Sequence, residues 1–287
     1  MSLFEKGSSQ NVSDGSVALQ AQGDITITNG LSAADVKVLF EMLFENQFPK
    51  IQEIAREQAL INHNEFQAKV ISDLHKNSER IIIDKFKDPD VQALINDTLT
   101  SAARKGDKSH PELLSKLIVE KVSIGSSDLK EIVINEAIGV IPKLTNLQIS
   151  LICGVFILKN LQMTYPLGDV VYSLKDLHDA FESKFGLNLN LSETNLNHIS
   201  YTGACNYNDF MGVDAFDVYL EKYKNFNTPN KAEALSKLKA IAPSIERFLE
   251  NINTPRIGGI TLTSVGLAIA ITALKEIRSM DYAIWIQ

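Results

Sequence analysis

The sequence predicts a mainly helical protein, in which a multi-helix bundle follows a short β-solenoid-like segment and precedes a winged-helix-like segment. Three observations support this fold class. Apolar residues recur at helical spacing from residue 31 onward, whereas glycines recur every eight residues in the first thirty residues. Near the C-terminus, two helical patterns are followed by a short strand pattern and an uncharged helix pattern. We therefore divide the chain into residues 1–30, 31–165, 166–230 and 231–287.

The first thirty residues have the pattern of short stacked strands. Gly7, Gly15 and Gly23 are eight residues apart, and apolar residues alternate with polar ones after the second and third of these glycines. Alternation is the period of a strand with one buried face, and glycine permits a sharp bend between strands. The side chains predicted to point to the buried face are Val17, Leu19, Ile25 and Ile27.

Residues 1–30 are predicted to bring copies of the chain together. Four apolar side chains are too few to offset the conformational entropy that is lost when such a segment becomes ordered. Identical copies in contact would bury more apolar surface and would cover the open strand edges. We therefore expect a homo-oligomer. The alternatives are a polar tail, or a segment that packs on its own subunit.

The region from 31 to 165 is predicted to form a helical bundle, because its apolar stripes lie between clear start and stop signals. Asp88 and Pro89 begin one helix, Gly106 ends it, and Thr145 with Gln148 forms a capping box. A long helix after Pro49 has a stripe predicted to be buried, which comprises Ile51, Ile54, Ala55, Ala59, Phe66, Val70, Ile71 and Leu74. The expected helices are 36–44, 49–74, 89–105, 111–125, 128–140 and 147–161.

Residues 166–230 are less regular, and residues 231–287 resemble the end of a winged-helix domain. Helices are expected over 174–185, from 192, over 213–225, over 232–241 and over 244–252. A strand over 259–262 and a helix over 264–277 complete the chain. The winged-helix resemblance rests on the order of these elements and on the run Leu262-Thr263-Ser264-Val265-Gly266, which opens the last helix.

The composition favours a soluble cytoplasmic protein. The chain has 287 residues, of which 45% are hydrophobic, and its net charge is −7. Cys153 and Cys205 do not form a disulfide framework, and the N-terminus does not resemble a signal peptide. Cys153 lies in an apolar run and is expected to be a core residue.

The motifs of common enzyme classes do not occur, so no catalytic residue, cofactor site or metal site is expected. There is no phosphate-binding loop, nucleophile elbow or His-Glu-x-x-His motif, and no two of the five histidines have metal-ligand spacing. His63, His75 and His178 are expected on solvated helix faces. Asp169, Glu182 and Lys184 are the residue types of a metal-dependent nuclease, but a helical pattern points Glu182 and Lys184 in different directions.

Two other functions compete with a protein-binding role. A winged-helix regulator would contact DNA through Lys237, Lys239, Arg247 and Arg256, because residues 231–287 carry seven Lys/Arg against five Asp/Glu. This excess is small, so we expect a protein-binding version of the motif. A membrane-disrupting effector would use residues 257–274, which carry no charge over eighteen residues. Their three glycines and four hydroxyl residues favour a buried strand and helix instead.

Several stretches resemble an uncharacterised family of bacterial, mainly helical proteins of about this length. They are Asn46-Gln-Phe-Pro49, Phe86-Lys-Asp-Pro-Asp-Val-Gln92, Ala103-Arg-Lys-Gly-Asp107, Asn135-Glu-Ala-Ile138, Pro142-Lys-Leu-Thr145 and Leu262-Thr-Ser-Val-Gly-Leu-Ala-Ile269. This resemblance implies no activity. Residues 1–30, called the leader below, are similar to Gly-rich β leaders in prokaryotic conflict proteins, and that similarity implies a role in antiphage defence.

The sequence thus predicts a non-enzymatic, homo-oligomeric sensor or scaffold. Its expected partners are other copies of the chain and a second protein, while nucleic acid and membrane are not expected.

Overall fold

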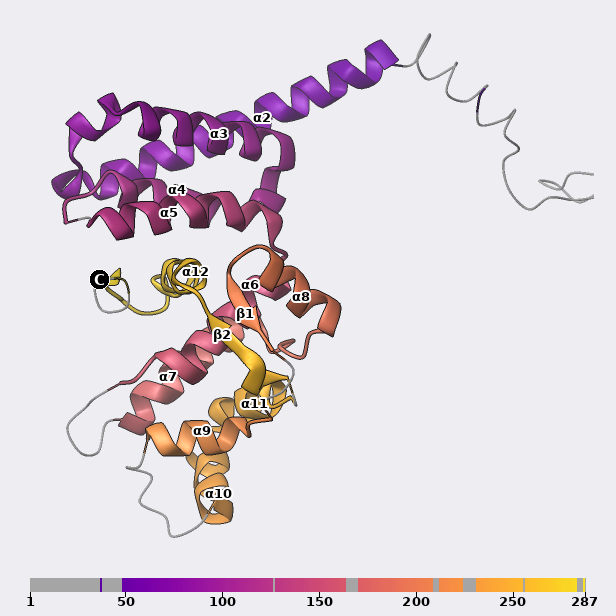
Figure 1. The fold of residues 1–287 in the computed structure, drawn as a ribbon, viewed down its shortest axis with the longest axis vertical. Helices are drawn as coiled ribbons and strands as arrows, with labels where there is room; N and C mark the ends of the chain where they lie inside the picture. Colours follow the sequence, from indigo (N-terminus) through magenta and orange to yellow (C-terminus); the bar gives the residue numbers. More distant parts are fainter. Residues whose placement is uncertain are drawn as a thin grey trace, which may run out of the picture. The chain divides into compact units, whose positions relative to one another are not determined.

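The computed structural model describes Lys37 and residues 48–125, 127–163, 170–208, 212–223, 231–254, 256–282 and 286. In this part of the chain the protein is mainly helical, as predicted (Figure 1). The leader, with Val17, Leu19, Ile25 and Ile27, lies outside the described residues, and so does all of the helix expected over 36–44 except Lys37. Residues 1–55 and 56–287 form two units, and the second contains the core described below.

The first helices of the larger unit begin and end at the signals that the sequence provides. The Asp88 carboxylate caps the helix that begins at Pro89 by accepting from the Asp90 amide at 2.8 Å, and Gly106 ends this helix with a positive φ of 54°. The Ser127 hydroxyl caps the helix that ends at Val140, the last residue predicted for it. The elements are α2 (Phe48–Lys76), η2 (Ser78–Arg80), η3 (Ile83–Lys87), α3 (Pro89–Lys105), η4 (Gly106–Ser109), α4 (Pro111–Lys121), α5 (Asp128–Val140) and η5 (Ile141–Lys143).

The stripe predicted for α2 is only partly buried. Phe66 is 2% exposed, and Val70 packs against the core. Ile54 and Ile71, however, are 61% and 59% exposed, and Ala55 is exposed as well, so these three residues were wrongly assigned to the buried face. Ile71 follows Phe66 by five residues, and a rotation of about 140° between them places the two side chains on different sides of the helix.

The next elements match the predicted order, with two additions. The Thr145 and Gln148 capping box is present, with hydrogen bonds of 3.3 and 3.0 Å. After Val155 the helix widens into a π-helical turn, and a short strand appears at Cys205, neither of which was predicted. The elements are α6 (Asn146–Val155), the π-helical turn η6 (Phe156–Asn160), α7 (Val170–Phe185), α8 (Glu193–Tyr201), β1 (Cys205–Tyr207), α9 (Ala215–Lys222), α10 (Lys231–Ile241), α11 (Pro243–Ile252), η8 (Ile257–Gly259), β2 (Ile260–Leu262) and α12 (Ser264–Leu274).

The two-stranded sheet joins the predicted segments 166–230 and 231–287, because one strand comes from each. β1 pairs antiparallel with β2, with Cys205 opposite Leu262 and Tyr207 opposite Ile260. The order of helix, helix, strand and helix expected for residues 231–287 is confirmed. Within the described residues, however, the strand of this segment pairs with β1, which lies outside the segment. The winged-helix resemblance therefore stays a prediction.

Helix α12 is the central element of the larger unit. It packs against α4, α5 and α6, and Ala268, Ile269, Ala270 and Ile271 are fully buried (Figure 1). Cys153 also lies in this core, as expected. One cluster of buried apolar side chains extends from α2 to Ile286 and crosses the boundaries proposed at residues 165 and 230. Residues 257–274 thus form the expected buried strand and helix. Among the residues the structure describes, no helix has the length and apolar character needed to cross a membrane.

The run from Leu262 to Gly266 positions α12 against β1. The Thr263 hydroxyl accepts from the Gly266 amide at 3.2 Å and donates to the Gly203 carbonyl at 2.5 Å, while the Thr263 amide donates to the Ala204 carbonyl at 3.2 Å. A Cβ atom on Gly266 would lie 1.9 Å from that Ala204 oxygen. Only glycine allows this approach, so the run has a packing role in this fold.

The other end of α12 is fixed by a buried carboxylate. The side chain of Glu120 lies 2.6 Å from the Lys130 ammonium, 3.1 Å from that of Lys275 and 3.5 Å from the Arg80 guanidinium. Burial acts to raise the pKa of Glu120, but the charges of Lys275 and Lys130 outweigh it, so the pKa is below its ordinary value. The Lys275 ammonium also lies 3.9 Å from the centre of the Tyr282 ring. Glu120 thereby links α4, α5 and the residues after α12.

Substitution of Gly266 by alanine is expected to destabilise the protein by about 3 kcal/mol or more, because the new methyl group overlaps a backbone oxygen that cannot rotate away. Urea unfolding of wild type and Gly266→Ala at pH 7 measures the difference. Gly139→Ala is the matched control, since Gly139 lies in α5 with no atom within 4 Å of an added Cβ. The control should be neutral or up to about 1 kcal/mol more stable. Equal stabilities for the two variants would contradict the close approach.

Candidate functional site

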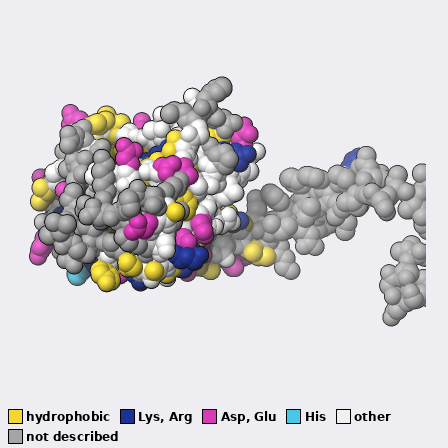
Figure 2. Space-filling view, turned by 90° about the horizontal axis from the view of Figure 1, so that it is seen from below, with side chains coloured by type: hydrophobic (Ala, Val, Ile, Leu, Met, Phe, Trp, Pro, Cys, Tyr) yellow, Lys and Arg dark blue, Asp and Glu magenta, His cyan; other side chains and the backbone are white. Residues whose placement is uncertain are grey.

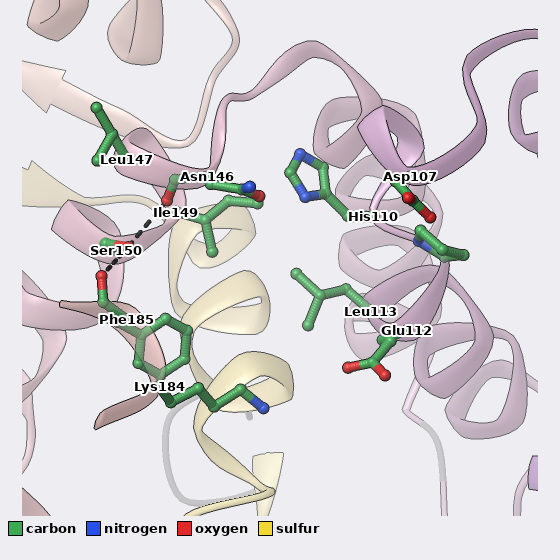
Figure 3. Close-up of a pocket in the computed structure, with 11 residues that line it drawn as sticks. Asp107, His110, Glu112, Leu113, Asn146, Leu147, Ile149, Ser150, Lys184 and Phe185 are labelled. Carbon is green, nitrogen blue, oxygen red and sulfur yellow. Dashed lines mark hydrogen bonds between the residues drawn. The ribbon is translucent and has the colours of Figure 1, made fainter. Parts of the chain in front are cut away.

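A cleft with a volume of about 460 Å³ lies between the start of α4 on one side and α6 with the end of α7 on the other (Figure 3). Its lining combines polar and apolar side chains, which come from segments far apart in the sequence. The lining residues are Asp107, His110, Pro111, Glu112, Leu113, Asn146, Leu147, Ile149, Ser150, Lys184 and Phe185.

The turn between α3 and α4 places His110 at this cleft. Pro111 disfavours a right-handed helical conformation for the residue before it. His110 instead takes the left-handed conformation, with a φ of 58°, and it is the only residue other than glycine with a positive φ in the described part of the chain. Its carbonyl accepts from the Leu113 and Leu114 amides and so begins α4. This left-handed backbone conformation sets the direction in which the His110 side chain leaves the main chain.

The imidazole of His110 is held by one hydrogen bond. Its Nε2 atom lies 2.7 Å from the Leu144 carbonyl oxygen. Because a carbonyl oxygen can only accept, Nε2 carries the hydrogen, and Nδ1 of the neutral ring is then an acceptor. In Figure 3 the ring faces Asn146 across the cleft. The pair forms a polar end at which a ligand group can be hydrogen-bonded.

The opposite wall is positioned by the capping box of α6 and by Ser150. Gln148, which completes the capping box, also donates to the Asn195 side chain at 3.2 Å, so the start of α6 is tied to α8. The Ser150 hydroxyl lies 2.9 Å from the Asn146 carbonyl and 3.1 Å from the Phe185 carbonyl (Figure 3). These bonds hold α6 against the end of α7.

The middle and the far end of the cleft differ in character. Leu113 and Ile149 approach from opposite walls beside Phe185, and below them Glu112 and Lys184 lie on opposite sides (Figure 3). Burial lowers the pKa of Lys184, while the charge of Glu112 opposes this shift. Lys184 also forms an ion pair with Glu276, which pairs with Lys116 as well. The cleft is therefore polar at one end, apolar in the middle and charged at the other end.

This arrangement is suited to binding an amphipathic group. Leu113 and Ile149, which are 9% and 3% exposed, offer a small apolar contact, while His110 and Asn146 offer an acceptor and an amide. Within the described residues, no group of three or more His, Cys, Asp or Glu side chains is placed to hold a metal ion.

Two overlapping segments of the chain, residues 30–228 and 210–286, match a family model. The chain belongs to this uncharacterised family. No curated protein and no solved structure matches the chain. The first matched segment begins at residue 30, so the family match includes α2–α12 and the cleft but not the Gly-rich leader. The resemblance to an uncharacterised family is thus confirmed, while the link to antiphage defence stays a prediction.

The residues predicted to contact DNA are not all free to do so. Arg247 donates to Glu182 of α7 through two hydrogen bonds of 2.6 and 3.0 Å, and the Lys239 ammonium lies 3.5 Å from Glu246. Lys237 lies in α10, and Arg256 is half-buried before η8. On the face in Figure 2, acidic side chains are scattered among hydrophobic ones. The described side chains of this face form no continuous basic stripe.

Two of the three residues considered for a nuclease site bind different partners in the described part of the chain. Glu182 and Lys184 lie on helix α7, as the sequence predicted, and they bind Arg247 and Glu276 respectively. Asp169 lies outside the described residues.

The expectation that His178 lies on a solvated helix face was wrong, because His178 is fully buried. It follows Leu174 by four residues and precedes Phe181 by three, which places it on the apolar face of α7. Its Nδ1 atom lies 2.7 Å from the Leu174 carbonyl, and its ring contacts Phe248 edge-on. Burial lowers the pKa of His178 to about 4, and the hydrogen bond to Leu174 only partly opposes this. His75, by contrast, is exposed as expected.

His178 is expected to make the fold less stable in mild acid. Its pKa is lowered from 6.5 to about 4 on folding, so the unfolded chain binds a proton that the folded chain excludes. Above pH 6.5 the neutral His178 ring makes its full contribution to the free energy of unfolding. This contribution is lost as the pH falls towards 4, where the loss approaches about 3 kcal/mol. Urea unfolding at pH 7.0 and 4.5 should show a smaller loss of stability for His178→Leu than for wild type.

His75→Leu provides the control for this measurement, because His75 is exposed on α2. This variant should lose as much stability between the two pH values as wild type does. Carboxylates titrate alike in all three proteins, so the difference isolates His178. A loss in His178→Leu equal to that of wild type would refute the assignment.

Proposed function

We propose that the protein is a non-enzymatic, homo-oligomeric scaffold that acts through protein–protein contacts, with the His110 cleft as the site that receives a segment of a partner protein. The observation that carries the proposal is the composition of the cleft. An apolar middle between Leu113 and Ile149 suits one apolar side chain of a bound segment. His110 and Asn146 at its polar end suit the backbone of that segment.

Exposed apolar side chains near the cleft and on other helices support a role in protein contacts. Leu147 at the rim of the cleft is 42% exposed. Leu60, Ile61 and Ile71 of α2 are each at least 50% exposed. Each of these side chains leaves apolar surface in contact with water, which a protein partner could cover.

Self-assembly is the second part of the proposal, and it rests on the glycines that recur every eight residues in the leader and on the alternating apolar residues after them. Full-length chains with both Val17→Asp and Ile25→Asp are expected to lose assembly, because charges on the predicted buried faces oppose their burial against other copies. Size-exclusion chromatography with light scattering should give a mass above one chain for wild type and the mass of one chain for the double variant. A wild-type mass of one chain would end this part of the proposal.

Antiphage defence is the biological process that we propose for this scaffold. Cells that express the wild-type protein should reduce phage plaque numbers, and the double variant should not. Equal plaque numbers with wild type and with an empty vector, across a panel of phages, would contradict this role.

The partner-binding role is tested at the rim of the cleft. Leu147→Glu places a charge at the rim of the cleft and should abolish recovery of a partner. Leu129→Glu is the matched control, because Leu129 on α5 is 48% exposed and does not line the cleft. The measurement is quantitative mass spectrometry of proteins cross-linked to the tagged chain in its native host. Equal recovery of every protein with both variants would refute the cleft as the binding site.

A further inference from the structure

Lys222, the last residue of α9, has an unusual environment for a lysine. Its ammonium donates to the Leu158 carbonyl at 2.9 Å and to the Ile157 carbonyl at 3.4 Å, and the side chain is half-buried. No carboxylate pairs with it in the part of the chain that the structure describes. Lys121 and Lys130, in contrast, are more deeply buried and each pairs with a carboxylate.

The π-helical turn η6 explains why a lysine lies here. The Leu161 amide donates to the Phe156 carbonyl at 2.8 Å, five residues earlier, instead of the usual four. This widening and the end of the helix leave the carbonyls of Ile157 and Leu158 available to other donors, and Lys222 supplies one. Next to it, the Tyr223 hydroxyl donates to the Leu161 carbonyl at 3.3 Å. Two side chains at the end of α9 thus hold it against η6.

We propose that Lys222 is a site of acyl modification, at which its ε-amine attacks the carbonyl carbon of an acyl thioester. A carbon–nitrogen bond forms, the carbon–sulfur bond breaks, and the proton lost by the amine passes to the departing thiolate, so that an amide and a free thiol result. The half-buried position and the absence of a paired carboxylate among the described residues favour the neutral amine that this step requires.

The electrostatics support this site over the other lysines. Burial lowers the pKa of Lys222 to about 8. At pH 7 about one tenth of the amine is then neutral, which is about 300 times the fraction for an ordinary lysine of pKa 10.5. The weaker basicity and the partial burial offset much of this gain, so we expect a rate advantage of about tenfold over an exposed lysine.

Lys159 provides a comparison within the same region. It too donates only to carbonyls, those of Ile260 at 2.7 Å and Gly258 at 3.0 Å, and burial lowers its pKa. Both of its hydrogen bonds are short, and each stabilises the protonated form. Lys222 has one short bond and one long one, so its proton is the easier of the two to remove.

Acylation of Lys222 would also change the local structure. The product amide has no charge and one N–H group, so it cannot maintain both hydrogen bonds to the Ile157 and Leu158 carbonyls. The contact between α9 and η6 would then depend on Tyr223 and on apolar packing. Modification is therefore expected to loosen the end of α9.

The test uses the full-length chain with a small-molecule acetyl thioester, S-acetyl-N-acetylcysteamine, at pH 7. Mass spectrometry of peptides over time gives the acetylation rate of each lysine. Lys222 should react about ten times faster than Lys108 and Lys143, which are both exposed. The rate of Lys222 should level off once the pH exceeds about 8. A rate for Lys222 that does not exceed that of Lys108 would overturn the proposal.

A second measurement separates the effect of this site from that of acetylation elsewhere. Lys222→Arg keeps the charge and the donors but cannot be acetylated by the thioester. After equal treatment, hydrogen exchange of residues 215–223 should become at least threefold faster in wild type and remain unchanged in Lys222→Arg. Equal exchange in the two treated proteins would overturn the structural effect that we assign to the modification.

Discussion

The close approach of Gly266 to the Ala204 carbonyl is the constraint on which the larger unit depends. It sets the distance between β1 and the start of α12, and α12 is the helix around which α4, α5 and α6 pack. At the other end of this helix, Glu120 binds cations from two further elements and from the residues after α12. One end is thus fixed by a steric limit and the other by charge, so the central helix has little freedom to slide along its axis.

Much of the helical framework was predictable, because the signals for helix ends are local. Asp88 with Pro89, Ser127, and Thr145 with Gln148 each act within four residues, and the helices they begin start within two residues of the predicted positions. Strand β1 was missed because its three residues are extended only by pairing with β2, which is distant in sequence. His178 was misplaced because charged neighbours on α7 suggested a solvated face, whereas the spacing of Leu174, Leu177 and Phe181 indicated the buried one.

The cleft was not predictable from motifs, since its lining comes from the α3–α4 turn, α6 and the end of α7. A local signal for one of its residues was nevertheless present. His110 lies between Gly106, which ends α3, and Pro111, which begins α4. A residue in this position continues neither helix, so the chain turns there. This signal identifies the turn but not its neighbours, because the hydrogen bond from His110 to Leu144 joins residues that only the tertiary fold brings together.

The pairing of β1 with β2 also has a consequence for biosynthesis. When β1 leaves the ribosome, its partner strand and α12 have not yet been made, so the apolar faces of α4, α5 and α6 lack the helix that covers them in the finished protein. The nascent chain therefore exposes apolar surface until α12 (Ser264–Leu274) emerges. Chaperone capture during translation is the natural safeguard for such a topology, and a ribosomal pause before residue 260 would lengthen the period of exposure.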